Sequence, residues 1–178
     1  DRVRFIGTRH EQGAAYMAFG YARSTGRPSA YVVVPGPGVL NTTAALCTAY
    51  ACNAPVLCLT GQIPSTSIGR GFGELHELPD QLATLRTLTK WAGRIESPAQ
   101  APSGVAQAFR HMLTGRPRPV ALEMAIDVMA AEAEVEPAAA QPVESNAADP
   151  ALIEHAARII AAARAPMIYV GGAVSEEH

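Results

Sequence analysis

Long apolar runs and clusters of a single charge are both missing from this sequence. No uninterrupted apolar stretch reaches the roughly 18–20 residues that a membrane-spanning helix needs, although 48% of the 178 residues are hydrophobic. The 14 Lys and Arg residues nearly balance the 16 Asp and Glu residues, without a basic stripe. These absences predict a globular protein that binds neither nucleic acid nor a membrane. The chain opens on Asp1-Arg2 without a signal peptide, which favours a cytoplasmic protein.

Cysteine is scarce and carries no framework of disulfides or metal ligands. Cys47, Cys52 and Cys58 form no C-x-x-C pair, and each lies in an apolar stretch. An odd number of cysteines without regular spacing predicts reduced, buried thiols in a cytosolic protein. A reactive thiol is the weaker alternative, because no basic neighbour in the sequence would lower its pKa.

Several catalytic and phosphate-binding motifs are also absent. Gly36-Pro37-Gly38 is followed by Asn41 where a dinucleotide-binding loop would have its third glycine, and neither a G-x-S-x-G nor a Walker motif occurs. His76, Glu77 and Asp80 lack the second histidine of the H-E-x-x-H zinc motif. We therefore expect no metal site in this chain, and we interpret these three residues as a structural or substrate-facing cluster.

Short apolar runs alternate with longer runs of helix-forming residues. The apolar runs predict strands at residues 3–6, 29–34, 55–60, 90–95 and 119–126, and the runs between them predict helices at 10–25, 39–52, 79–87 and 102–113. A rigid loop is expected at 35–38. Strands joined through helices by short connections predict an α/β fold, a three-layer parallel sheet with helices on both faces. The continuous apolar run 31–34 predicts a strand buried on both faces.

The composition changes after residue 130. Residues 131–148 are rich in Ala, Pro and Glu without an apolar period, which is typical of a linker between domains. Asp149 and Pro150 then predict the start of a helix that runs to about residue 163, followed by a strand at 166–170. So few elements cannot bury a core. We therefore expect residues 149–178 to be the truncated start of a second, Rossmann-like α/β domain after a first domain at 1–130.

Polar residues and glycines lie where predicted strands give way to helices or loops. Glu11 opens the first helix, Gly36-Pro37-Gly38 and Asn41 follow the second strand, and Gln62 follows the third. Ligands of open α/β sheets bind at the carboxyl edge of the strands. Each candidate also has a purely structural interpretation: an acid favoured by the helix dipole, a tight strand-to-helix turn, and a loop glutamine that faces solvent. Their shared edge makes them candidates for one ligand site.

Three runs of sequence, in fitting order and spacing, carry a family resemblance. They are residues 9–26, beginning Arg9-His10-Glu11-Gln12-Gly13, residues 36–41, Gly-Pro-Gly-Val-Leu-Asn, and residues 55–64, Pro-Val-Leu-Cys-Leu-Thr-Gly-Gln-Ile-Pro. This region resembles the pyrimidine-binding domain of the acetolactate synthase-like thiamine diphosphate enzymes. The resemblance covers residues 3 to about 127 and, more weakly, the segment from 149 onward. It implies that the first strand and first helix of that domain precede residue 1.

The resemblance implies a role for each candidate residue. Glu11 matches the catalytic glutamate that hydrogen-bonds N1′ of the cofactor's aminopyrimidine ring. The cofactor-binding positions around that ring are matched by Val34, Gly36, Pro37, Gly38 and Asn41, and Gln62 matches a glutamine near the cofactor and the substrate channel. Leu75-His76-Glu77 stands where many members carry Phe-Gln-Glu, so His76 is expected to face the substrate.

The implied activity is the decarboxylation or carboligation of 2-oxo acids with thiamine diphosphate. A carboxylic acid against N1′ favours the imino form of the 4′-amino group, which takes the proton from thiazolium C2. A dry site would raise the pKa of the Glu11 carboxyl and allow this proton sharing near neutral pH. The family binds its cofactor between subunits, so a homodimer or homotetramer is implied, and Mg²⁺ is held by a domain absent from this chain. We therefore expect residues 1–178 alone to be inactive; FAD in the central domain is compatible with the resemblance but not indicated.

Some residues depart from the family pattern. Pro35 replaces a common serine, Val34 stands where some decarboxylases carry a histidine, and residues 123–127 lack a proline that many members have. Two other interpretations therefore stay open at the level of sequence. One is a cofactor-free structural or regulatory domain of the same fold, and the other is a generic nucleotide-binding α/β domain.

Overall fold

The computed structural model describes residues 4–139, 142 and 147–171, and the chain divides into two units, residues 1–143 and 144–178. The first unit carries all the candidate site residues. Residues 131–139 at its end have no regular structure and are exposed. The predicted domain limits at 130 and 149 stay predictions, because residues 140–141 and 143–146 lie outside the described residues. None of the described helices has the length and apolar character needed to cross a membrane.

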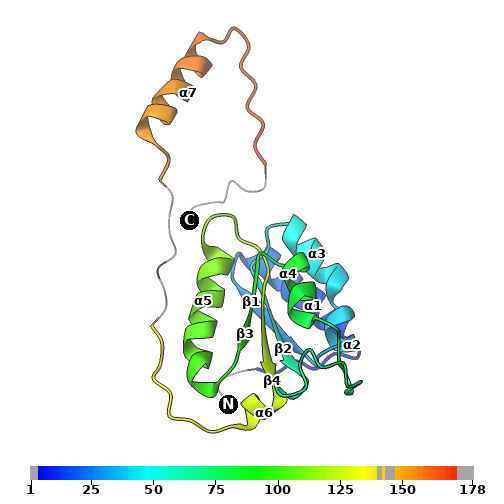
Figure 1. The fold of residues 1–178 in the computed structure, drawn as a ribbon. Helices are drawn as coiled ribbons and strands as arrows, with labels where there is room; N and C mark the ends of the chain where they lie inside the picture. Colours follow the sequence, from blue (N-terminus) through cyan, green and yellow to red (C-terminus); the bar gives the residue numbers. More distant parts are fainter. Residues whose placement is uncertain (1–3, 140–141, 143–146, 172–178) are drawn as a thin grey trace. The chain divides into compact units, whose positions relative to one another are not determined.

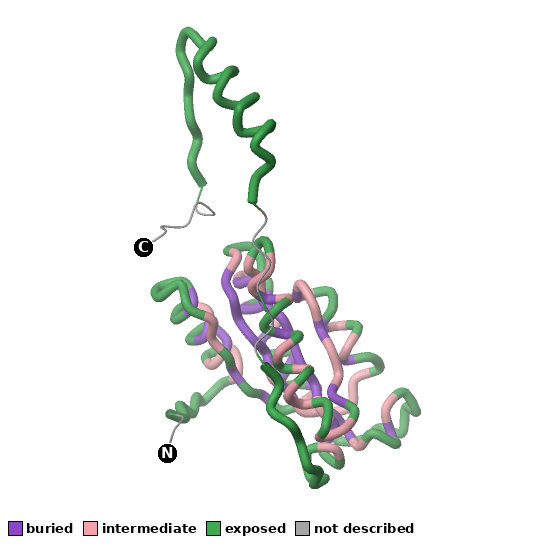
Figure 2. The backbone as a smooth tube through the Cα atoms, turned by 90° about the vertical axis from the view of Figure 1, so that its left-hand side faces the viewer, coloured by how far each residue is buried: buried purple, intermediate pink, exposed green. Residues whose placement is uncertain are grey.

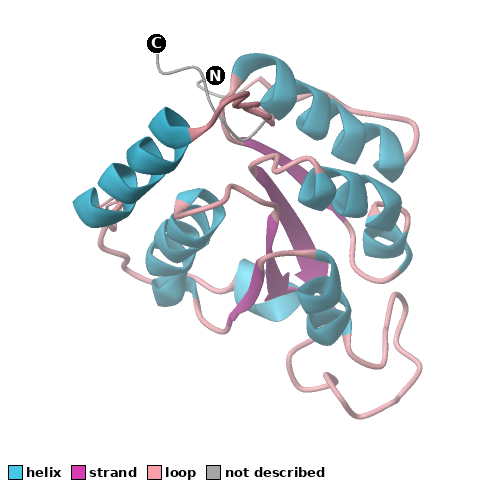
Figure 3. Cartoon of the chain, turned by 90° about the horizontal axis from the view of Figure 1, so that it is seen from above, coloured by secondary structure: helices cyan, strands magenta, loops and turns pink. Residues whose placement is uncertain are grey.

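The first unit is built on a parallel sheet. Its strands are β1 (Ser29–Val33), β2 (Val56–Gln62), β3 (Trp91–Ile95) and β4 (Val120–Ala125), in the spatial order β1-β2-β4-β3. Each neighbouring pair runs parallel, so all the carboxyl ends meet at one edge (Figure 1). Helices lie on both sides of the strands (Figure 3). The predicted three-layer α/β fold is therefore confirmed for this unit.

α1 (Glu11–Thr25) shows why the first helix forms where the sequence predicts it. His10 caps its start, because the side chain accepts a hydrogen bond at 3.1 Å from a backbone N–H of the first turn. The buried side of the helix consists of three alanines, Ala15, Ala18 and Ala22. Their spacing of about one helical turn lets α1 lie close against the sheet. The sheet thus fixes the position of Glu11 at the start of the helix.

Three helices cover one face of the sheet: α1, α3 (Thr43–Ala51) and α4 (Gln81–Leu88). Their inward residues form one apolar cluster with side chains of the strands, in which Leu46, Leu85 and Cys58 are almost completely buried. Figure 2 shows the buried residues concentrated along the strands and the helix sides that face them. This cluster is the larger part of the core.

The other face is covered by α5 (Ala101–Leu113), which follows the short 3-10 helix η1 (Pro98–Gln100). Ala108 and Met112 of α5 are fully buried in a second cluster with inward residues of β2, β3 and β4. The described helices leave the corresponding side of β1 open, so Val32 is 65% exposed. The prediction that this strand is buried on both faces was therefore wrong. An apolar run cannot reveal whether a helix reaches an edge strand.

The helix predicted at 39–52 is broken in two. α2 (Pro37–Leu40) begins inside the predicted loop, and α3 follows as a separate helix. Thr42 lies at the break and is fully buried. Its hydroxyl donates to the carbonyl of Val39 at 2.8 Å and accepts from the hydroxyl of Tyr31 at 3.0 Å. A hydroxyl that bonds the preceding turn competes with regular helix geometry. The bond between Tyr31 and Thr42 is a tertiary contact, which the hydrophobic period of the sequence does not predict.

Two predicted short strands do not form. Residues 4–8 have no regular structure, and Phe5 is 87% exposed, while Val3 lies outside the described residues. In the second unit, α7 (Pro150–Ala162) forms as predicted with Asp149 as its cap, but residues 166–170 are irregular and exposed. A strand needs a neighbouring strand to pair with its N–H and C=O groups. β-branched composition alone cannot supply that neighbour.

The three cysteines are free thiols, but only Cys58 is buried as predicted, whereas Cys47 and Cys52 are exposed. Cys47 lies within α3 and Cys52 caps its end. Both side chains are exposed although their neighbours in the sequence are apolar. Burial raises the pKa of the Cys58 thiol to about 12. This thiol therefore stays protonated and unreactive at neutral pH.

Replacing Met112 by alanine should lower the free energy of unfolding of the first unit by about 2–5 kcal/mol, because it leaves a cavity beneath α5. Val105 on the same helix is 38% exposed, so Val105→Ala is the matched control and should change this free energy by at most about 0.5 kcal/mol. Urea unfolding followed by the fluorescence of Trp91, the single tryptophan, measures both variants. Equal effects would contradict the packing of α5 on the sheet.

Candidate functional site

The candidate residues gather around the carboxyl ends of the strands. The turn at Gly36 follows β1 after two residues, and Gln62 is the last residue of β2. A short connection joins the end of α1 to the start of β1, so the start of α1 lies beside the end of β1. The fold therefore brings the first residue of α1, Glu11, to the same edge of the sheet.

Glu11 and Asn41 are in direct contact although they are far apart in the sequence. The amide Nδ2 of Asn41 donates a hydrogen bond to Oε2 of Glu11 at 3.0 Å. Asn41 stands between α2 and α3, where the break at Thr42 turns the chain. Two residues that the sequence analysis assigned to one ligand site thus meet. The bond also orients the carboxylate of Glu11, which is partly exposed.

The environment of Glu11 favours its charged form. A hydrogen bond from its own backbone N–H and the bond from Asn41 hold the pKa of the Glu11 carboxyl below its ordinary value, and the neighbouring His10 adds a smaller effect in the same direction. The expectation of a raised pKa concerns a dry, covered site and stays a prediction, whereas in this chain by itself the pKa of the Glu11 carboxyl is lowered. The carboxyl is only partly covered, so the cost of burial is smaller than the gain from the hydrogen bonds.

Gly36 forms a tight turn that only glycine fits. Its φ of 60° lies in the left-handed region. A Cβ at this position would overlap the backbone carbonyl of His76, so the backbones of the two residues are in contact. His76 itself has a positive φ of 72°, which is uncommon for a residue other than glycine. The structure thus brings His76, which the resemblance places near the substrate, against the turn that the resemblance places near the cofactor.

The rest of the turn is closely packed. A Cβ on Gly38 would lie 2.7 Å from Cγ2 of Val34, so the Val34 side chain fills the space beside the turn while half of the residue stays exposed. Pro37 begins α2, where its fixed φ suits the first helical position. Val34 and the Gly36–Gly38 turn, four of the five positions that the resemblance assigns to the aminopyrimidine pocket, therefore lead directly to the fifth, Asn41, which contacts Glu11.

Gln62 is a buried strand residue and not a loop glutamine that faces solvent. Only 4% of its surface is exposed. Its Oε1 accepts a hydrogen bond from the N–H of Ile63 at 2.8 Å, and its Nε2 donates to Oε2 of Glu123 at 3.4 Å. Both ends of the amide are used inside the protein. Gln62 therefore acts as a fixed wall residue.

Glu123 is the centre of a polar network at the strand ends. It lies on β4 and is fully buried. The Nε and Nη2 atoms of Arg94 on β3 both approach its Oε1 at 2.6 Å. Its Oε2 accepts hydrogen bonds from Nε2 of Gln81 at 2.8 Å and from Gln62. A carboxylate shielded from solvent is thus held by one cation and two amides.

Sequence reasoning missed this network. Arg94 and Gln81 were not singled out, and Glu123 was noted only because a proline is lacking nearby. One signal was available: a glutamate inside the apolar run Val120-Ala-Leu-Glu-Met-Ala, and an arginine in the preceding strand. Charged residues are almost never fully buried unless they are paired. Reading the strand that carries Glu123 as central would therefore have predicted a charged partner for it, and Arg94 in the preceding strand is a cation that the sequence offers.

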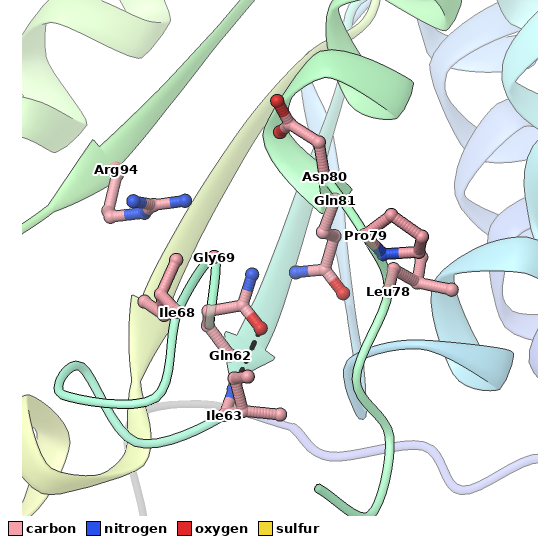
Figure 4. Close-up of a pocket in the computed structure, with 9 residues that line it drawn as sticks. All are labelled: Gln62, Ile63, Ile68, Gly69, Leu78, Pro79, Asp80, Gln81 and Arg94. Carbon is pink, nitrogen blue, oxygen red and sulfur yellow. Dashed lines mark hydrogen bonds between the residues drawn. The ribbon is translucent and has the colours of Figure 1, made fainter. Parts of the chain in front are cut away.

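A small cavity of about 160 Å³ lies beside this network. Its polar lining comes from Gln62, Asp80, Gln81 and Arg94, and Figure 4 shows the two glutamine amides and the arginine directed toward the same space. Glu11 is not among its lining residues. Pockets for organic ligands have volumes of roughly 300–1,000 Å³, so this cavity is too small to be a complete cofactor site.

The long loop between β2 and α4 is held by its own carboxylates. Glu77 accepts hydrogen bonds from the backbone N–H groups of Gly71 at 3.1 Å and Glu74 at 2.8 Å. Asp80 caps α4 by accepting from the N–H of Ala83 at 2.8 Å. Within the described residues, no group of three or more His, Cys, Asp or Glu side chains could hold a metal ion. The hydrogen bonds of Glu77 and Asp80 give both residues a structural role in this part of the chain.

Comparisons with known proteins point to one family. Residues 1–84 match the family described as thiamine pyrophosphate enzymes, N-terminal TPP binding domain. The probable 2-ketoarginine decarboxylase AruI of Pseudomonas aeruginosa is 40% identical over 172 residues, which cover 96% of this chain and 31% of that protein. The acetolactate synthase of Arthrospira platensis is 36% identical over 171 residues, 92% of this chain and 29% of the relative.

A third relative, the large subunit of acetolactate synthase isozyme 1 of Escherichia coli, is 35% identical over 176 residues, which cover 97% of this chain and 31% of the relative. The chain thus spans about three tenths of the length of these curated relatives. The family match at 1–84 includes Glu11, the Gly36 turn, Asn41, Gln62 and His76. All the residues that the sequence analysis proposed for the site therefore lie inside the matched region.

The Glu11 carboxyl should titrate below the ordinary glutamate pKa, and Asn41→Ala should raise that pKa, because one of its two main hydrogen bonds is lost. The hydrogen bonds to ionised Glu11 lower its pKa in the folded state and so stabilise that state. This stabilisation is present above the unfolded-state pKa and is lost as the pH falls through the folded-state pKa. Carbon-13 NMR of the side-chain carboxyl groups against pH measures it. Gln12→Ala removes a neighbouring amide and should leave the pKa unchanged; an unshifted Glu11 in Asn41→Ala would contradict the contact.

Proposed function

Because this chain belongs to the thiamine pyrophosphate enzymes, of which it carries the N-terminal TPP-binding domain, we propose that its full-length protein is a thiamine diphosphate-dependent decarboxylase or carboligase of 2-oxo acids. The observation that carries the proposal is the carboxylate of Glu11, held by Asn41 at 3.0 Å beside the turn at Gly36. A fixed acceptor of this kind suits a heterocycle nitrogen that must carry a proton.

The residues at the strand ends fit an aminopyrimidine ring in chemical type. Glu11 is an anionic acceptor with a lowered pKa. The turn at Gly36 is packed against the backbone of His76, which a Cβ at Gly36 would overlap, so its position beside the ring site is fixed. Val34 and Pro37 supply apolar surface, and both are exposed. We therefore assign the ring to Glu11 and Asn41 on one side and to the Gly36–Gly38 turn on the other.

In this proposal the protein positions a proton and the cofactor performs the bond breaking. Thiamine diphosphate, when bound, supplies the nucleophilic carbon and accepts the electron pair released by decarboxylation. Glu11 holds the proton shared with N1′. Covering its carboxylate with the ring and a neighbouring subunit removes water, which raises the pKa from the low value in this chain. Gln62, fixed by Ile63 and Glu123, bounds the site.

The finer parts of the proposal rest on the resemblance. The substrate is a small 2-oxo acid faced by His76. Formation of acetolactate and decarboxylation of 2-ketoarginine are the first activities to assay, since the relatives are named acetolactate synthases and a probable 2-ketoarginine decarboxylase. Mg²⁺ is bound by a part of the protein outside this chain. The protein is a cytoplasmic homodimer or homotetramer with the cofactor between subunits, and a flavin is not indicated.

The backbone of the turn disfavours a dinucleotide site. Pro35 and Pro37 have no N–H, Gly36 donates its N–H to Gln81 at 2.8 Å, and Gly38 donates to the carbonyl of Pro35 at 3.4 Å. A phosphate cradle needs free backbone donors, and residues 35–38 have none left. Calorimetric titration of the full-length protein separates the interpretations: saturable thiamine diphosphate binding supports the proposal. Binding of a dinucleotide alone favours the nucleotide domain, and binding of neither favours the cofactor-free domain.

Glu11→Gln in the full-length protein should lower kcat for release of carbon dioxide from its 2-oxo acid by about 10²-fold or more, because the amide cannot share a proton with the ring nitrogen. Glu96→Gln is the matched control, since Glu96 is an exposed glutamate just after β3, and it should keep the wild-type rate. Turnover of Glu11→Gln close to that of Glu96→Gln would exclude Glu11 from the reaction.

A further inference from the structure

We propose that Gln81 is a positioning residue for the cofactor site, because its side-chain amide fastens the turn at Gly36 to the buried Glu123, which is paired with Arg94. The inference rests on the proposed function, since it gives Gln81 a task in that same site. Gln81 lies in the first turn of α4, 45 residues after Gly36 in the sequence, and only 1% of its surface is exposed.

One end of the amide holds the turn. Oε1 of Gln81 accepts a hydrogen bond from the N–H of Gly36 at 2.8 Å, and this bond is buried. The prolines on either side of Gly36 have no N–H to offer. On its other side, Gly36 contacts the backbone of His76. The turn is therefore fixed between the side-chain oxygen of Gln81 and the backbone of His76.

The other end of the amide is fixed by two acceptors. Nε2 of Gln81 donates to Oε2 of Glu123 at 2.8 Å and to the carbonyl of Gly61 at 3.0 Å. Turned over, the amide would place its NH₂ group against the N–H of Gly36 and its oxygen against the Glu123 carboxylate and the Gly61 carbonyl. All three contacts would then be repulsive, so the orientation of the amide is determined by its partners.

The charge of Glu123 anchors this arrangement. Arg94 places its Nε and Nη2 atoms 2.6 Å from Oε1, which leaves Oε2 for the amides of Gln81 and Gln62. Hydrogen bonds to an ionised acceptor are roughly twice as strong as those between neutral groups. Gln81 therefore links the buried Glu123 of β4, held by Arg94 of β3, to a turn that follows β1.

The Gly36 turn also determines the position of Asn41. The N–H of Leu40 donates to the carbonyl of Gly36 at 3.0 Å, and the N–H of Asn41 donates to that of Pro37 at 2.9 Å. α2 is thus a single short turn of helix, flanked at its start by Gly36 and at its end by Asn41, the residue that holds Glu11. A shift of Gly36 would be passed along α2 to the Glu11 carboxylate.

The test compares Gln81→Met with Gln107→Met in the full-length protein. Gln107 is an exposed glutamine on α5, so the control makes the same exchange of side chains away from the network. Methionine has nearly the volume of glutamine, but its thioether is only a weak acceptor for the Gly36 N–H and has no donor for Glu123. Gln81→Asn is a second variant that keeps the amide but shortens its reach, and it decides the question if Gln81→Met does not fold.

Two quantities are measured, the exchange rate of the Gly36 amide and the Kd for thiamine diphosphate. Hydrogen exchange of the Gly36 amide, followed by mass spectrometry without cofactor, should become about tenfold faster in both Gln81 variants, because one buried hydrogen bond is lost. Calorimetric titration with thiamine diphosphate and Mg²⁺ should give a Kd raised by about tenfold for the same reason. Exchange in peptides of α5 should stay at the wild-type rate in every variant, which separates a local effect from general loosening.

Unchanged exchange at Gly36 in the Gln81 variants would overturn the inference whether or not thiamine diphosphate binds. Faster exchange with an unchanged Kd would also overturn it, because the turn would then be held but would not serve the site. A wild-type protein that binds no thiamine diphosphate would refute the proposed function and, with it, the cofactor part of the inference. In that case, faster exchange would still show that Gln81 holds the turn.

Discussion

A buried carboxylate at the strand ends is the constraint on which this arrangement depends. Glu123 has no exposed surface, so its charge must be met by Arg94 from β3 and by amides from α4 and β2. Removing one partner of a buried ion pair typically costs about 3–5 kcal/mol, because the remaining charge is left without water or counter-ion. These bonds to Glu123 join β4 to β3, to β2 and to α4 near the carboxyl edge of the sheet. Glu123 is the one acidic residue in the four strands.

The candidate site is held from two directions that meet at Asn41. From the sheet, Gln81 carries the order of the Glu123 network to the turn at Gly36, and α2 carries it on to Asn41. The second support is α1, which lies close against β1 and β2 on small alanines and presents Glu11. Rigid elements that support a reacting group keep its geometry with little cost at the moment of reaction. The low pKa of Glu11 in this chain shows what a covering ring and subunit would have to change.

Features set by neighbouring residues in the chain could be predicted from the sequence. The cap at Asp149, the order of helices and strands, and the placing of Glu11, the Gly36 turn and Asn41 at one edge all follow from local patterns. Features set by tertiary partners could not. Val32 is exposed because α5 does not cover its strand, the segment at 4–8 has no partner strand, and Thr42 breaks a helix through a bond to Tyr31. Gln81 joins groups that only the folded chain brings together, so no sequence spacing indicates it.

The central claim is that this edge of the sheet presents the Glu11 carboxylate to the aminopyrimidine ring of thiamine diphosphate. The most direct measurement is a crystal structure of the full-length protein with thiamine diphosphate and Mg²⁺. The account predicts a carboxyl oxygen of Glu11 about 2.6–3.2 Å from N1′ of the ring, with the ring against the Gly36–Gly38 turn and the Gly36 N–H still bonded to Gln81. A ring bound elsewhere, with the Glu11 carboxylate facing solvent, would contradict it.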